Sequence, residues 1–96
     1  MRYFHRTTLA PDLVLAHAKV FFGARLVPAE ESPRRRVYSG GIGKVAISAR
    51  PEGGHYTLVE VGTDQPGESE LDRLAKRFLA EVHQVVEPTH EVRGAY

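Results

Sequence analysis

Two stretches of the chain have the pattern of apolar positions that predicts α-helices. Residues 11–22 are apolar on nearly every side, and Pro11 and Gly23 suit the start and the end of a helix. From Leu71 onward apolar residues recur at 71, 74, 75, 78, 82, 85 and 86, and Pro88 disfavours a helix beyond residue 87. We therefore expect one helix that is buried on more than one side and one amphipathic helix.

Short segments with alternating or β-branched residues predict the strands. They cover residues 2–8, 44–50 and 55–61, with a further short strand near Val37 and Tyr38. Residues 51–54 read as the turn of a hairpin. A four-residue turn would place Tyr56 on the same face as Ala49. Residues 28–36 read as a polar loop.

These elements predict a single α+β domain over residues 1–88, followed by a C-terminal tail over residues 89–96. Their order is β-α-β-β-(β)-α, in which the bracketed strand is the short one. Strands in this order favour an antiparallel sheet of three to four strands with both helices on one face. The pairs Asp72/Lys76 and Arg77/Glu81 have the i,i+4 spacing of ion pairs on the outer side of the second helix.

Composition narrows the class of protein further. The chain has no cysteine, which excludes disulfides and thiolate metal sites. Its N-terminal residues lack the apolar core of a signal peptide, and no apolar stretch approaches the roughly 20 residues of a membrane span. We expect a cytoplasmic protein that makes no membrane contact.

The near-neutral net charge of +1 hides an asymmetry between the two halves. Residues 1–50 hold nine lysines and arginines against three acidic residues, whereas the second half is acidic. A basic sheet face could neutralise phosphates, so nucleic-acid binding is one alternative function. The residues that would carry it are Arg34, Arg35, Arg36, Lys44 and Arg50.

The first predicted helix favours a different function, because its apolar arc is wider than one contact surface requires. We interpret the chain as a small, non-enzymatic binding or interaction module. It would be homodimeric, with a hydrophobic pocket or a subunit interface under helix 11–22. The candidate ligand-binding or interface residues are Leu15, His17, Phe21, Phe22 and Tyr56.

No catalytic residue, metal ligand set or cofactor motif stands out. The five histidines lie far apart in the sequence, and a glycine-rich Gly40–Lys44 segment lacks the rest of a phosphate-binding loop. We expect no metal and no cofactor. A second alternative is a small enzyme with its pocket around His17, since this histidine falls in the apolar arc.

The segment from GKVAISARPEGG through HYTLVEVGTD to ESELDRLAKRFLAEVHQVV resembles the C-terminal part of helix-grip domains, the START and polyketide-cyclase-like superfamily. The first strand and the helix that Pro11 opens are similar to the beginning of that family. The chain resembles a truncated version, because several central strands are missing. The order of elements also resembles the half-saddle of TATA-binding-protein-like domains, which implies a sheet face that contacts nucleic acid or protein.

Overall fold

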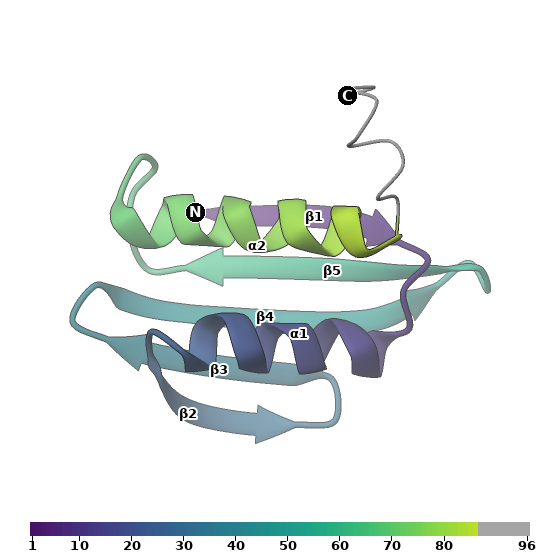
Figure 1. Ribbon diagram of the computed structural model, residues 1–96, viewed down its shortest axis with the longest axis horizontal. Coiled ribbons are helices and arrows are strands. Elements are labelled where there is room, and N and C mark those ends of the chain that lie inside the picture. The colour runs from purple at the N-terminus through teal and green to yellow at the C-terminus, as the bar shows by residue number, and fades with distance from the viewer. Residues whose placement is uncertain (87–96) are drawn as a thin grey trace.

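The computed structural model describes residues 1–86, which form seven elements (Figure 1). In chain order they are β1 (Arg2–Thr7), α1 (Pro11–Gly23), β2 (Val27–Ser32), β3 (Arg35–Gly40), β4 (Gly43–Glu52), β5 (Tyr56–Thr63) and α2 (Glu70–Val86). The predicted tail and the predicted domain end at residue 88 lie outside the described residues. Within residues 1–86 no helix is long and apolar enough to cross a membrane.

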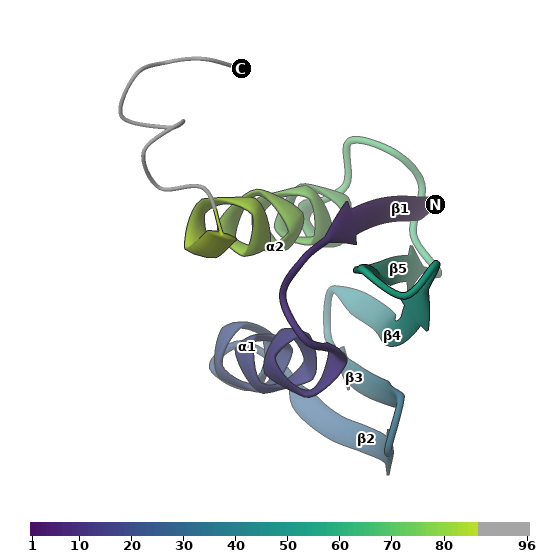
Figure 2. The same ribbon diagram turned by 90° about the vertical axis from the view of Figure 1, so that its right-hand side faces the viewer.

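All five strands join one antiparallel sheet in the order β1-β5-β4-β3-β2. Both helices lie on the same side of this sheet, as Figure 2 shows, and the other side is open. Helix α1 packs mainly on β3 and β4, and α2 packs mainly on β1 and β5. The protein is therefore an α+β fold with two layers, in which each helix covers one half of the sheet.

The prediction of three to four strands in the order β-α-β-β-(β)-α is wrong, because the polar segment taken as a loop contains β2. All six β2 residues are exposed, so the strand has no buried side chain to give a hydrophobic signal. Its hydrogen bonds to β3 and the ion pairs Arg35–Glu30 and Arg36–Glu31 hold it in place. A register shift at Ala29 accommodates Pro28 at the sheet edge.

The β4–β5 hairpin differs from the prediction by one residue. Its loop has three residues, Gly53 to His55, and two of them are glycines with positive φ. Val59 therefore pairs with Ala49, and the neighbouring Leu58 faces the open side of the sheet. Because side chains alternate along a strand, this single-residue change also places Tyr56 on the open side.

The apolar core lies between the sheet and the two helices. Its largest fully buried side chains include Phe22 of α1, Tyr38 of β3 and Phe78 of α2. Phe22 stacks on Tyr38 with 6.0 Å between ring centres and meets Phe78 at 5.2 Å. The space under α1 is thus filled by side chains.

The glycine-rich segment forms the tight turn between β3 and β4. Gly40 pairs with Gly43, and residues 41 and 42 connect them. A Cβ at Gly40 would lie 2.8 Å from the Leu26 side chain, so the glycine lets Leu26 pack across the sheet end. Gly43 has a φ of +127°, and a Cβ there would lie 2.7 Å from the Gln65 side chain.

Candidate functional site

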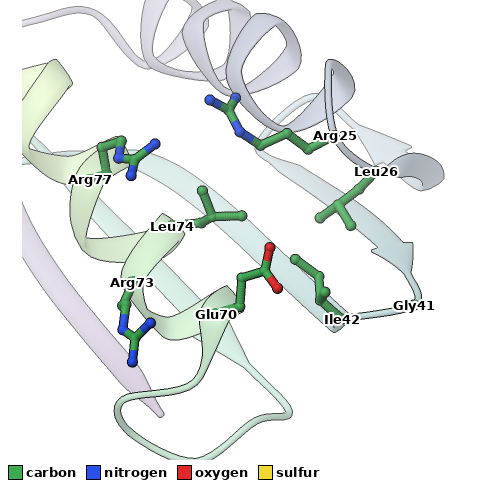
Figure 3. A pocket seen from close by; sticks show the side chains of 8 residues that line it. All are labelled: Arg25, Leu26, Gly41, Ile42, Glu70, Arg73, Leu74 and Arg77. Carbon is green, nitrogen blue, oxygen red and sulfur yellow. The ribbon is translucent and has the colours of Figure 1, made fainter.

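A groove of about 630 Å³ opens between the C-terminal end of α1, the β3–β4 turn and the first half of α2 (Figure 3). Its apolar lining comes from Leu26, Ile42 and Leu74, each from a different element. Its charged lining residues are Arg25, Glu70, Arg73 and Arg77. The groove therefore combines an apolar surface with three guanidinium groups and one carboxylate.

The arginines of this groove differ from most others in the protein. Within residues 1–86, five arginines form ion pairs: Arg2 with Glu60, Arg6 with Glu52, Arg34 with Asp12, Arg35 with Glu30 and Arg36 with Glu31. The four described arginines that have no carboxylate within 4.0 Å are Arg25, Arg50, Arg73 and Arg77. Three of these four line the same groove, which makes it the place where the fold gathers uncompensated positive charge.

Arg25 is fixed in position by the end of α1. Its guanidinium donates a hydrogen bond of 2.7 Å to the backbone carbonyl of Phe21 and lies 4.3 Å from the centre of the Phe21 ring. The first contact satisfies a carbonyl of the last helical turn, and the second is a cation–π contact. Both leave other N–H groups of the guanidinium available to a ligand.

Arg77 lies on the opposite wall, on the stretch of α2 that faces the groove. Glu70, Leu74 and Arg77 have the i, i+4, i+7 spacing that places side chains on one side of a helix. In Figure 3 the Arg25 and Arg77 guanidiniums lie on one side of Leu74. The Glu70 carboxylate lies on its other side, near Ile42. Arg73 points away from this row.

A second hollow of about 280 Å³ continues the space between the helices, and Arg25 borders both. Val20 and Phe21 of α1 line it together with Phe78 of α2. His17 of α1 and Glu81 of α2 are polar residues of its lining. His17 is exposed and does not lie inside the core.

The structure brings only part of the predicted ligand set together. His17 and Phe21 line the second hollow, whereas Leu15 and Phe22 are buried in the core under α1. Tyr56 is 51% exposed and lies on the open side of the sheet, away from both helices. The hollows lie beside α1, at its side that faces α2.

The five predicted nucleic-acid residues are spread over three places. Arg34 lies at the β2–β3 turn and pairs with Asp12 of α1, and Arg36 lies on the helix-covered side of β3. Arg35, Lys44 and Arg50 share the open side, where Arg35 already pairs with Glu30. Of this set, Lys44 and Arg50 alone have no carboxylate within 4.0 Å among residues 1–86.

The sequence interpretation missed the groove because it assigned Arg77 to an ion pair with Glu81. That contact does not form, while the other expected pair, Lys76–Asp72, measures 3.3 Å. A usable signal was the spacing of Arg73 and Arg77, two cations one turn apart on one helix. Arg25 and Gly41 gave no such signal, because the tertiary fold alone brings them beside α2.

Polar contacts hold the inner side of α2 against β1. The Tyr3 hydroxyl donates a hydrogen bond to the buried carboxylate of Asp72, which also accepts one from the Glu68 N–H at 3.0 Å. These contacts hold the pKa of Asp72 below its usual value, with the Tyr3 hydrogen bond as the main cause.

Farther along the same contact, the rings of His5 and His83 meet edge to face at 6.0 Å. Burial lowers the pKa of His5, and the nearby His83 lowers it further. Within residues 1–86 no group of three or more histidine, aspartate and glutamate side chains is arranged to hold a metal ion.

Comparisons with protein-family models, with curated proteins and with solved structures gave no match to this chain. The groove therefore has to be interpreted from its own residues.

Proposed function

We propose that the protein is a small, non-enzymatic binding module that takes an amphipathic organic anion into the groove between α1 and α2. The observation that carries this proposal is the gathering of three uncompensated arginines beside an apolar surface. An acid group would bind between Arg25 and Arg77, and the apolar part would lie on Leu26, Ile42 and Leu74. Small-ligand sites combine apolar walls with a few placed polar groups in this way.

Octanoate is a suitable probe, because it joins one carboxylate to an apolar chain. Titration into the ¹⁵N-labelled protein should shift the backbone NMR signals of residues around the groove. In Arg77→Gln the octanoate Kd should rise about tenfold, which matches the loss of one charge-assisted hydrogen bond.

Arg50→Gln is the matched control, since Arg50 has the same charge and no ion pair but lies on the open side of the sheet. It should leave the Kd unchanged. Equal weakening in both variants would mean that net charge alone attracts the probe, and absence of shifts in the wild type would overturn the proposal.

Self-association through exposed apolar residues of α1 is a second candidate function. Leu13 is 52% exposed and Val20 is 76% exposed, and their i,i+7 spacing places both on one side of the helix, where Val20 borders the second hollow. If this surface joins two copies into a homodimer, Leu13→Glu should yield a monomer in analytical ultracentrifugation. A wild-type protein that stays monomeric at high concentration would remove this candidate.

Nucleic-acid binding through the open side of the sheet has less support. Phe4 and Tyr56 are exposed on the same side as Arg50, but Glu52 and Glu60 also lie there and pair with Arg6 and Arg2. Binding of a single-stranded oligonucleotide that weakens steeply with salt and is lost in Arg50→Gln would favour it.

The family, the cellular location and the absence of a cofactor also belong to this proposal. Kinship with helix-grip or TATA-binding-protein-like domains is supported only by the order of elements and by the long closing helix. A cytoplasmic location and function without a cofactor also stay predictions.

A further inference from the structure

We propose that the ligand of the groove is amphoteric, with an amine at one end, an acid group at the other and an apolar body between them. This inference rests on the proposed function and adds the second charged end. The observation behind it is Glu70, whose carboxylate lines the groove without an ion pair to any described residue, although three arginines share that groove.

The charged groups lie in a fixed order along α2. Glu70 is followed by Leu74 one turn later and by Arg77 nearly two turns later. Seven residues of helix correspond to about 10 Å along the axis. The opposite wall repeats this order, with Ile42 of the β3–β4 turn towards the Glu70 end and Arg25 at the Arg77 end (Figure 3).

This order selects the ligand by charge at both ends. A cationic amine would compensate the Glu70 carboxylate, and a carboxylate would bind the two guanidiniums. An extended chain advances about 3.5 Å for every three bonds, so about eight or nine bonds would span the 10 Å. ω-Aminooctanoate has this length and both charged ends.

Leu26 and Leu74 form the apolar middle of the groove. Leu26 can lie across the sheet end only because Gly40 has no side chain, since a Cβ there would lie 2.8 Å from it. Leu74 faces it from α2 as a core residue with 8% exposure. A straight apolar chain would cover both side chains, whereas a small charged ion such as phosphate would cover neither.

Glu70 also stands in the first turn of α2, where a negative charge stabilises the helix whether or not a ligand binds. The test must therefore separate binding from stability. Three probes of equal chain length do so: ω-aminooctanoate, octanoate and octylamine, each titrated by NMR and calorimetry.

The wild type should bind ω-aminooctanoate about tenfold more tightly than octanoate and should bind octylamine most weakly. Glu70→Gln should abolish the difference between ω-aminooctanoate and octanoate without weakening octanoate binding. Arg77→Gln should weaken both acids. Glu68→Gln is the matched control, because it removes a neighbouring exposed carboxylate that does not line the groove.

The outcomes distinguish the two proposals. Equal affinity for octanoate and ω-aminooctanoate in the wild type would overturn the amphoteric ligand and leave the anion site standing. Glu70→Gln that lowers thermal stability but keeps the difference between the two acids would assign Glu70 to the helix alone. No binding of either acid would overturn both proposals.

Discussion

The two helices cover different parts of one sheet, and the contacts that hold them to it differ in kind. Helix α1 buries Val14, Leu15, Ala18, Phe21 and Phe22, and its first residues have no side-chain cap. Helix α2 buries an apolar stripe too, but its first turn is also fixed by the Ser69 hydroxyl and by the contacts of Asp72 with Tyr3 and Lys76. Apolar packing is thus the main buried contact of α1, whereas α2 adds the contacts of a buried carboxylate.

This difference matters for the groove, because each helix supplies one wall. A wall held by packing keeps its position over a wide range of pH, and a wall held by titratable groups does not. Arg25 should therefore stay in place under conditions that loosen Arg77. Four measurements can test the comparison.

The largest effect is expected from Phe22→Ala. The ring is fully buried and contacts Tyr38 and Phe78, so its removal leaves a cavity and should cost about 3–5 kcal/mol of unfolding free energy. Val20→Ala removes an exposed side chain of the same helix and should change stability by less than about 0.5 kcal/mol. Denaturant unfolding measures both, and similar losses would refute the claim that buried packing holds α1.

Ser69→Ala should cost about 1 kcal/mol, because the Ser69 hydroxyl accepts a hydrogen bond of 3.1 Å from the Asp72 N–H at the start of α2. Ser69→Thr keeps the oxygen and should recover most of the loss. If alanine and threonine behave alike in thermal unfolding, the cap does not stabilise α2.

Removal of the hydroxyl should have different effects at the two tyrosines that lie under the helices. The Tyr38 hydroxyl is buried beside α1 without a hydrogen-bond partner among the described residues, so Tyr38→Phe should be neutral or stabilise by about 1 kcal/mol. Tyr3→Phe removes the hydrogen bond to Asp72 and should destabilise the protein. A destabilised Tyr38→Phe would show that this hydroxyl has a partner in solution.

The smallest effect is expected from pH. The pKa of His5 lies below its usual 6.5, so the unfolded chain takes up a proton at a higher pH than the folded protein does. Stability should be full above pH 6.5 and should fall as the pH drops through the lowered pKa. Urea midpoints at about pH 8 and about pH 5 measure this loss.

His5→Gln should reduce that loss, and Phe22→Ala should retain it. Asp72 does not interfere in this window, because its pKa lies below 3.8 and its stabilising contacts weaken only in stronger acid. An unchanged pH dependence in His5→Gln would show that the β1–α2 contact is not sensitive to this histidine.

Elements that bury apolar side chains could be predicted from the sequence, whereas the fully exposed strand β2 could not. The apolar run of α1, the stripe of α2 and the alternation of β4 all reflect burial, and each predicted its element to within a few residues. Strand β2 buries nothing, so only its partner β3 determines its conformation. The predicted pairing of the β4–β5 hairpin was wrong for a local reason. The loop has three residues in place of four, and this moves each side chain of β5 to the opposite side of the sheet from the one predicted.

The candidate site could not be predicted from the sequence for a different physical reason. A groove is formed by residues from several parts of the chain, and the core brings together the three that line this one, namely the C-terminal end of α1, the β3–β4 turn and α2. His17 drew attention because it interrupts an apolar arc, yet the arc is wider than the surface that α1 buries. Arg77 was assigned to a local ion pair, and local spacing does not show whether such a pair forms.

The exposed strand β2 has a consequence for how the molecule opens. None of its side chains supports the core, so it can separate from β3 while the rest of the sheet stays intact. Native-state hydrogen exchange should then divide one sheet into two cooperative units, with rapid exchange where β2 meets β3 and slow exchange in β4 and β5. This edge strand would unfold separately from the other four strands, so its sequence could change without loss of the fold.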